Sequence, residues 1–415
     1  MISLYSGKAK QFLFYLTPLT ISIGNPRWAG AVIILLSFFW IMEGGHAEKF
    51  NGWKSNYPLV GFILFFSLYP VSLLYTEHFD NGLFNIEKHL SYLFVPLVVL
   101  TSTTSKQAIS WALGIFSYSL VFLLVFCFLV ALHGFYVTGE TQVLINEIVV
   151  SRFQYYGLAS AMPGWHPTYV AMYANFALAY LFLKTLNHWN EIGPSIKFIN
   201  IGSIIVIIVS VLFLSSFMGI MVLIITVIFC AFYALVKFRR KRAIILSIVL
   251  ISGVAIGVFA LDNRISDSIK DLLNDKMEAT DEQSERNTLT IRLAKWSTSI
   301  DIIKSNIIFG VGPGDAPFEL YEMYKIRGHD YLAEHKYNPH NQYLEILLSF
   351  GLIGFMIFIF LYGNFLKLAL KGKNVLLLIL LIIIGLTGFT ESILERQQGV
   401  LFFSFFMPLL SHYKK

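Results

Sequence analysis

Apolar runs separated by short polar breaks extend along almost the whole chain. A helix that crosses a membrane needs about 20 apolar residues, and runs of roughly this length recur along the sequence. They lie near residues 11–24, 29–42, 58–75, 89–104, 108–136, 166–184, 198–214, 218–236, 243–260, 341–366, 374–391 and 398–412. The run from Phe198 to Val236 is about twice a membrane thickness at about 1.5 Å per helical residue, so we divide it at residues 215–219. The pattern predicts an all-α polytopic membrane protein with about twelve transmembrane helices.

The composition supports a membrane protein, and its basic residues orient the predicted helices. Hydrophobic residues make up 56% of the chain and charged residues 13%, which is too apolar for a soluble domain of this size. The net charge of +6 does not indicate binding to nucleic acid, because the basic residues are spread over short loops and one cluster at 237–242. With twelve spans these loops all fall on one side, which the positive-inside rule identifies as the cytoplasm. We therefore expect both termini in the cytoplasm.

The first apolar run and the two cysteines suggest no processing or redox role. The first run lacks a small-residue cleavage site and is followed by Asn25-Pro26-Arg27, so we expect a span and not a cleaved signal peptide. Cys127 and Cys230 each lie inside an apolar run, which predicts small buried side chains and no disulfide.

The orientation leaves two longer segments, 137–165 and 261–340, on the outer side of the membrane. We accordingly divide the chain into transmembrane helices one to nine (1–260), an outer helical loop (261–340) and transmembrane helices ten to twelve (341–415).

The outer loop contains two predicted helices and a glycine-rich turn. Helical spacing of apolar residues predicts an amphipathic helix over 265–277. A second helix is predicted from Arg292, with an apolar stripe formed by Leu293, Trp296, Ile300 and Ile303. The glycines at 310–314 predict a turn. No Lys-Ser/Thr pair follows them, which argues against a nucleotide-binding loop.

The most informative motif is Asn338-Pro339-His340-Asn341, set against the start of a long apolar run. Asn338 is a good N-cap and Pro339 suits the first helical position, so His340 and Asn341 are predicted to lie in the first turn. Free N–H groups and the helix dipole attract anions there and favour a neutral imidazole. The motif therefore predicts a general base beside an anion site. Glu345, one turn after Asn341, could orient the motif or form an ion pair within the bundle.

Cations on the same outer side could bind a phosphorylated substrate. Arg152, Arg292 and Arg396 each lie close to a predicted membrane boundary, where their planar guanidinium groups could hold a diphosphate. Trp296 follows Arg292 by one helical turn and could pack on a sugar or anchor the interface. Aspartates on this side are isolated, so we expect no metal site and assign its electrostatic role to the arginines.

His166 opens the sixth predicted span from the same side, in Trp165-His166-Pro167-Thr168-Tyr169. His166 could be a second acid or base or a substrate contact, with Tyr169 beside it. Alternatively, His166 caps the helix and its aromatic neighbours anchor the interface. The sequence leaves both interpretations open.

Four segments together resemble the signature of the O-antigen ligase and polymerase family: Arg292 to Trp296, the 310–314 turn, His340 to Glu345, and Gly351 to Gly354. The resemblance implies a GT-C-like membrane architecture with one large periplasmic loop in the bacterial inner membrane. It implies transfer of a glycan from undecaprenyl diphosphate to an acceptor at the periplasmic face, without metal, nucleotide or cofactor. By the same resemblance, His340 corresponds to the catalytic base and Arg292 to a diphosphate-binding arginine.

One departure from the family pattern concerns the hairpin at 215–219. The family usually carries an arginine after the serines of this hairpin, whereas this chain has Phe217 and Met218. We expect Arg152 or Arg396 to supply the missing phosphate contact.

Three functions remain compatible with the sequence. The first is a ligase that attaches glycan to a lipid A core, or to a protein as the O-oligosaccharyltransferases of the same family do. The second is an O-antigen polymerase that joins repeat units. The single large loop and the His340 motif favour the ligase. The third is a transporter, which is disfavoured because the spans are nearly free of charge and show no internal repeat.

Overall fold

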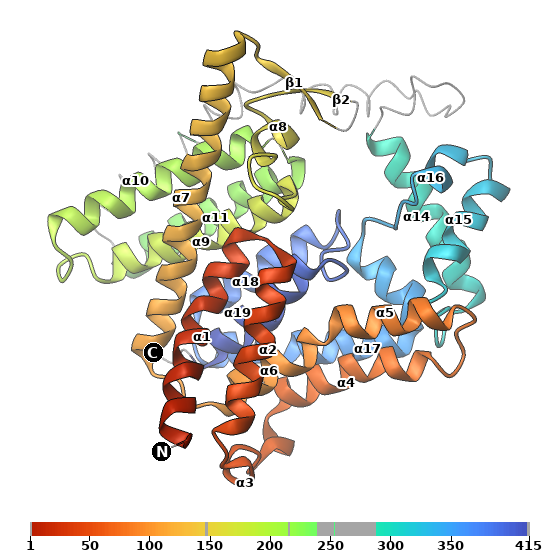
Figure 1. Cartoon of the computed structure of the whole chain (residues 1–415), viewed down its shortest axis with the longest axis horizontal. Coiled ribbons are helices and arrows are strands. Elements are labelled where there is room, and N and C mark those ends of the chain that lie inside the picture. Colours follow the sequence, from red (N-terminus) through yellow and green to blue (C-terminus); the bar gives the residue numbers. More distant parts are fainter. Residues whose placement is uncertain (1, 146–147, 215, 239–252, 254–287, 413–415) are drawn as a thin grey trace.

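Helices form almost all of the protein. The structure is a computed structural model that describes residues 2–145, 148–214, 216–238, 253 and 288–412 (Figure 1). Within these residues the strands are β1 (Gln142–Ile145) and β2 (Ile148–Ser151), which form one antiparallel pair. The helical architecture agrees with the predicted all-α membrane class. Both cysteines are free and buried, which confirms their predicted state.

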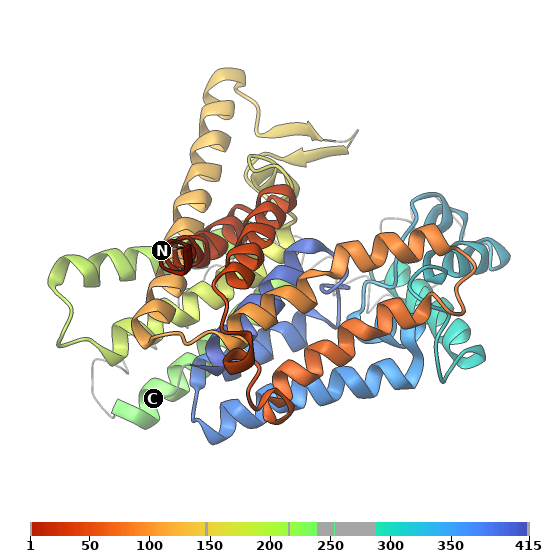
Figure 2. The same cartoon turned by 60° about the horizontal axis from the view of Figure 1, so that its bottom comes forward.

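The first third of the chain forms two packed helical groups and one long helix. Its elements are α1 (Ile2–Ile23), α2 (Pro26–Met42), α3 (His46–Lys49), the 3₁₀ helix η1 (Trp53–Ser55), α4 (Tyr57–Ser72), α5 (Phe79–His89), α6 (Ser91–Thr101) and α7 (Lys106–Thr138). Helices α1 and α2 form a hairpin that packs against α6 and α7, whereas α4 lies along α5 and α6. The far end of α7 carries the β1–β2 hairpin (Figures 1 and 2).

Helix α9 is the centre of the middle part, which comprises α8 (Tyr155–Ala159), α9 (Pro167–Asn187), α10 (Pro194–Phe213) and α11 (Phe217–Phe238). Almost every α9 side chain is buried, because α7, α10, α11 and α18 pack around it. Helix α10 ends at Phe213 and α11 begins at Phe217, which confirms the predicted break in the long apolar run.

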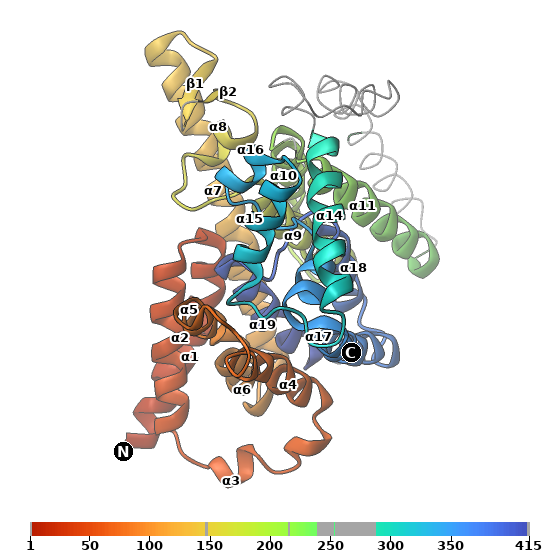
Figure 3. The same cartoon turned by 90° about the vertical axis from the view of Figure 1, so that its right-hand side faces the viewer.

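The last part contains three long helices and a small cluster beside them. The elements are α14 (Thr288–Ser305), α15 (Ala316–Ile326), α16 (Asp330–Glu334), α17 (Gln342–Lys371), α18 (Val375–Thr387) and α19 (Gln397–Ser411). Helices α14 to α16 stand together at one end of α17 (Figures 1 and 3). They share a separate apolar core, whose buried side chains include Ile302, Leu320 and Tyr324.

Helix α17 is broken at Gly351, and the glycine-rich turn fills the break. Gly351 has a φ of 61°, and a side chain there would overlap the carbonyl group of Ile308. The break exposes the carbonyl group of Leu348, which accepts a hydrogen bond from the Val311 N–H at 2.8 Å. The predicted turn is therefore confirmed, and two separate segments of the sequence signature meet in one backbone contact.

Among the described residues, fewer helices than the predicted twelve meet the length and hydropathy expected of a membrane span. Six helices among the described residues are long and apolar enough to cross a membrane, or seven if one bent pair counts as a span. The predicted count of twelve is not confirmed. The predicted span 243–260 and the amphipathic helix 265–277 lie outside the described residues.

The long helices separate two chemically different ends of the molecule. Helix α9 begins directly after His166 and carries Lys184 near its other end, and α17 begins two residues after His340 and ends at Lys371. At about 1.5 Å per residue, α9 is about 30 Å long, which equals the apolar thickness of a bilayer. Lys184 and Lys373 line one hollow at the far end, so several of the lysines predicted to be cytoplasmic gather opposite the two histidines.

Candidate active site

A cavity of about 440 Å³ lies where α5, α15, the 335–340 segment and the α18–α19 loop meet. His166, His340, Glu391 and Arg396 all contribute to its walls. Lys88, Glu345 and Glu395 line it as well. The structure thus brings together three of the residues predicted from sequence and adds carboxylates to them.

His340 lies just before α17 and not inside its first turn. The helix begins at Gln342, and the residue that caps it is Asn341, not Asn338 as predicted. His340 itself adopts a left-handed backbone conformation with a φ of 47°. Its N–H donates to Asn338 Oδ1 at 3.1 Å. The predicted position was wrong because two asparagines compete for the cap, and the one nearer the apolar run takes it.

Asn341 fixes the loop that carries His340. Its Oδ1 accepts hydrogen bonds from the N–H groups of Tyr343 and Leu344 at 3.0 and 3.2 Å. Its Nδ2 donates to the carbonyl oxygen of Phe389 at 3.2 Å. Because Phe389 lies just after α18, this one side chain ties the His340 loop to the loop that carries Glu391.

His340 and Glu391 form a hydrogen-bonded pair in the cavity wall. The His340 Nδ1 lies 3.2 Å from a carboxylate oxygen of Glu391, whose residue is only 5% exposed. Burial alone would raise the pKa of Glu391, but the hydrogen bond and the charges of His340, His166 and Arg396 together lower it. An ionised carboxylate accepts a hydrogen bond from Nδ1–H, so the lone pair of the neutral imidazole lies on Nε2.

His166 lies in the same wall as the N-cap of α9. Its Nδ1 accepts a weak hydrogen bond from the Thr168 N–H at 3.4 Å, and its ring packs edge-on against Tyr156 and Tyr169. Burial is the main cause that lowers the pKa of His166 to about 4; the charges of Arg396 and His340 act in the same direction, and Glu391 opposes them. His166 is therefore neutral at physiological pH. The structure confirms its capping role, while a role as acid, base or substrate contact stays a prediction.

The cations near the cavity differ in how they are held. Arg396 is exposed, and no described residue forms a hydrogen bond or ion pair with its guanidinium group. Arg292 lies on α14 and is partly buried, which lowers its pKa while Tyr155 and Glu391 act in the opposite direction. Neither guanidinium is neutralised by a carboxylate at ion-pair distance within the described part of the chain. Both are thus available to an anionic ligand.

The model of a known protein family matches a region of the chain that contains several of these residues. Residues 202–359 match the family model of the O-antigen ligases. Over this region, which is less than half of the chain, the protein is similar to the O-antigen ligase family. A comparison with curated proteins found no match. The family identifies a membrane glycosyltransferase of the O-antigen ligase or polymerase type.

The family match covers only part of the cavity. It includes Arg292, the 310–314 turn and His340, but it begins after His166 and ends before Glu391 and Arg396. The cavity therefore combines a segment shared with the O-antigen ligase family and segments that lie outside the matched region.

The hairpin that departs from the family pattern lies beside His166. The Ser216 hydroxyl is 3.4 Å from the Thr168 hydroxyl at the start of α9. Phe217, which stands where O-antigen ligases usually have arginine, is 42% exposed. The described residues 216–219 of this hairpin include no cationic side chain.

Arg152 does not join the cavity. Its Nε donates to the carbonyl oxygen of Glu140 at 3.2 Å, and its Nη2 lies 3.4 Å from both the Thr138 hydroxyl and the Gln142 carbonyl. The guanidinium therefore closes the end of α7 onto the β1–β2 hairpin.

Two further predicted site residues do not line the cavity. Tyr169 is buried, and its hydroxyl donates to the Ser392 carbonyl at 3.4 Å. Trp296 is on α14, where its indole N–H is buried without a hydrogen-bond partner among the described residues. Neither side chain lines the cavity.

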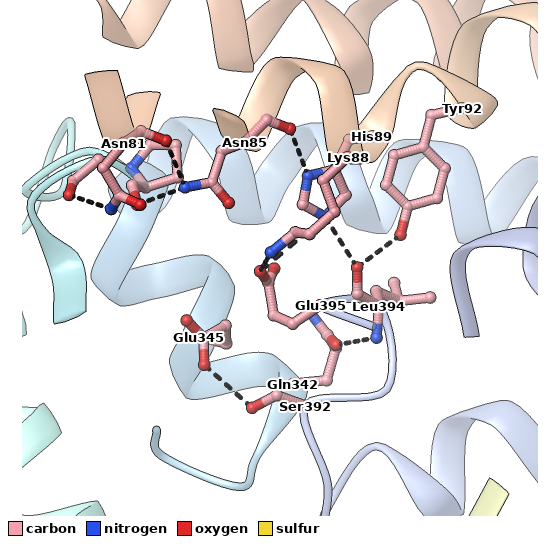
Figure 4. A network of polar contacts seen from close by, with 12 residues as sticks. Asn81, Asn85, Lys88, His89, Tyr92, Gln342, Glu345, Ser392, Leu394 and Glu395 are labelled. Carbon is pink, nitrogen blue, oxygen red and sulfur yellow. Dashed lines mark hydrogen bonds and ion pairs between the residues drawn. The ribbon is translucent and has the colours of Figure 1, made fainter. Parts of the chain in front are cut away.

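Carboxylates anchor the α18–α19 loop: Glu345, which the sequence had singled out, and Glu391 and Glu395, which it had not (Figure 4). Lys88 forms an ion pair with Glu395 at 3.3 Å, and the Ser392 hydroxyl donates to Glu345 at 3.0 Å. The Leu394 N–H donates to the Gln342 side chain at 2.6 Å. Glu391 and Glu395 are four residues apart beside Arg396, and this cluster of charges between two apolar runs was the available signal.

Asp315, one of the isolated aspartates, has a structural role. Its carboxylate accepts hydrogen bonds from the N–H groups of Glu77 and His78 and from the Thr76 hydroxyl, at 2.8–2.9 Å. Burial alone would raise the pKa of Asp315, but these hydrogen bonds lower it. Among the described residues, no group of three or more His, Cys, Asp and Glu side chains could hold a metal ion.

Proposed function

We propose that this protein is a ligase that transfers a glycan from undecaprenyl diphosphate to a hydroxyl of a lipid A core. We place the reaction at the periplasmic face of the bacterial inner membrane and infer that it needs no metal. The observation that carries the proposal is the His340–Glu391 pair at 3.2 Å in a cavity that also holds Arg396, for which no partner is found among the described residues.

The reaction is a single inverting displacement. The acceptor oxygen forms a bond to the anomeric carbon while the bond from that carbon to the diphosphate oxygen breaks. The leaving lipid diphosphate takes the electron pair, and His340 Nε2 takes the proton of the acceptor hydroxyl. The imidazolium later releases this proton to water, so atoms and charge balance.

Glu391 is a positioning residue in this scheme. Its carboxylate holds the Nδ1–H tautomer of His340, and its negative charge stabilises the imidazolium that forms during transfer. The lowered pKa of Glu391 keeps it ionised at neutral pH. His166 stays neutral beside it, so it can hydrogen-bond to a sugar hydroxyl without adding charge.

Arg396 and Arg292 stabilise the leaving group. A departing diphosphate concentrates negative charge on its terminal oxygens, and fixed guanidinium groups lower the energy of that state without needing a metal. Both side chains lack a carboxylate partner at ion-pair distance within the described residues, so binding the diphosphate costs them no existing ion pair.

The arrangement of charged ends supports a periplasmic site. The cavity lies at the end of α9 and α17 opposite to Lys184 and Lys373, and lysines mark the cytoplasmic side by the positive-inside rule. The lipid donor would enter from the outer leaflet, with its diphosphate at the level of His340.

The decisive test is transfer by purified His340→Ala protein in lipid nanodiscs, with a lipid-diphosphate glycan as donor and lipid A core as acceptor. We expect loss of transfer by at least about 10³-fold, because the base is removed. His188→Ala is the matched control, since His188 lies at the opposite end and pairs with Glu191. Near-normal transfer by the His340 variant would refute the assignment.

A deletion strain separates the ligase from the polymerase of the same family. Loss of all glycan from lipid A, with long glycans still on the carrier lipid, is the result expected for a ligase. Single repeat units on lipid A would instead identify a polymerase. Unchanged lipid A with loss of glycan on a surface protein would identify a protein O-oligosaccharyltransferase.

A further inference from the structure

Helix α14 buries a polar face next to the candidate site. The predicted apolar stripe is wrong in part, because Leu293 and Ile300 are 39% and 40% exposed. The buried face instead consists of Lys295, Thr298 and Ser299, followed by Ile302 and Ile303. A lysine on the buried face of a helix is costly unless a partner compensates its charge.

Lys295 has no polar partner within the described part of the chain. The residue is 4% exposed, and its ammonium group lies 3.9 Å from the ring centroid of Tyr337. A cation–π contact of this kind compensates only part of the cost of burying an ammonium group. Among the described residues, no anion therefore lies at ion-pair distance from the amine.

A second cation lies one helical turn away. Arg292 precedes Lys295 by three residues, so the two side chains share a face of α14. The charges that act on Lys295 are those of Glu391, which favours the protonated amine, and Arg292, which disfavours it. Helix α14 packs against α15 and α17. Among the described groups, neither of these helices carries a charged side chain that acts on Lys295. One carboxylate beyond ion-pair distance faces two cations, so the positive charge is in excess.

Tyr337 connects this cation pair to the cavity. Its ring lines the cavity and lies 5.8 Å from the ring of His340, centroid to centroid. The ammonium of Lys295 is on the face of that same ring. A change in the conformation of the Lys295 side chain would therefore bring its ammonium group to an anion bound near His340.

We propose that Lys295 is a donor-binding residue whose ammonium leaves the Tyr337 ring to contact a phosphoryl oxygen of the lipid diphosphate, next to Arg292. This inference rests on the proposed function, because it assigns a ligand to the same site.

The proposal makes diphosphate binding depend on pH. Burial lowers the pKa of Lys295 to about 8 in the empty site, and a bound anion would raise it. Affinity should be constant where the amine is already protonated, below about pH 7. It should fall as pH rises through about 8, by up to about tenfold per pH unit.

The test measures binding without turnover. Farnesyl diphosphate, farnesyl monophosphate and farnesol are titrated into the protein in nanodiscs at pH 7.0 and 9.0. We expect Lys295→Met to bind the diphosphate about tenfold or more weakly at pH 7.0 and to bind farnesol unchanged. Lys295→Arg should keep the wild-type affinity at pH 7.0 and lose the pH dependence, because arginine stays charged. Lys304→Ala is the control, since that exposed lysine of α14 pairs with Asp301.

The outcomes separate this inference from the proposed function. Unchanged diphosphate affinity in Lys295→Met, with His340→Ala still inactive in transfer, would overturn the role of Lys295 alone. A wild-type protein that binds farnesol and farnesyl diphosphate equally would overturn the diphosphate site as a whole. A parallel loss of farnesol binding in Lys295→Met would assign Lys295 a purely structural role.

Discussion

Replacing Glu391 by glutamine tests the His340–Glu391 pair most directly, because it removes a charge and keeps the size of the side chain. The carboxylate oxygen is 3.2 Å from His340 Nδ1. Two unit charges about 4 Å apart interact by about 4 kcal/mol at an effective dielectric constant of about 20. The His340 side chain is 25% exposed, and solvent screening reduces this to about 2–3 kcal/mol.

This energy acts mainly on the transition state, in which His340 gains a proton. The expected result for Glu391→Gln is a decrease in kcat on the order of 10²-fold with little change in the KM of the donor. Single-turnover transfer from a radiolabelled donor measures the step. Glu391→Asp keeps the charge and should recover part of the rate. A kcat within threefold of wild type for Glu391→Gln would refute the reasoning.

Two further predictions compare matched substitutions. Arg396→Ala should raise the KM of the donor by about tenfold, whereas Arg152→Ala should leave this KM unchanged and lower thermal stability, because Arg152 only closes α7 onto the β1–β2 hairpin. Steady-state kinetics measure the KM, and unfolding in detergent measures the stability. A raised donor KM in Arg152→Ala would contradict this division. Gly351→Ala should lower stability by about 2 kcal/mol or more, because its φ is positive and a side chain would clash with Ile308. Gly363→Ala on the same helix, with open space around it, should not lower stability. Equal unfolding temperatures of the two variants would count against the broken helix.

The helices could be predicted from sequence where a single long pattern determines them. The hairpin at 215–219 and the helix from Arg292 both follow from local runs of apolar residues. The start of α17 could not be predicted, because Asn338 and Asn341 are equally good caps by themselves. The choice depends on the carbonyl group of Phe389, which is distant in sequence and accepts a hydrogen bond from Asn341.

The candidate site shows the same limit. His340 could be identified from its motif, but its partner Glu391 is 51 residues away and has no motif of its own. The buried face of α14 was missed because it is polar: the hydrophobic pattern assigned Leu293 and Ile300 to the inside, whereas Lys295 is the buried residue. Periodicity finds buried apolar residues and cannot find a buried cation.

The residues proposed to catalyse the reaction come from two parts of the chain, one on each side of the cavity. The family match ends at residue 359, so it holds Arg292 and His340, while Glu391 and Arg396 come from the loop between α18 and α19. Asn341 connects the two parts through Phe389. A substitution that frees this loop, such as Asn341→Ala, would therefore separate His340 from Glu391 without removing either residue. Its effect on kcat should approach that of Glu391→Gln, and the double variant should be little worse than either single one, because both act on the same pair.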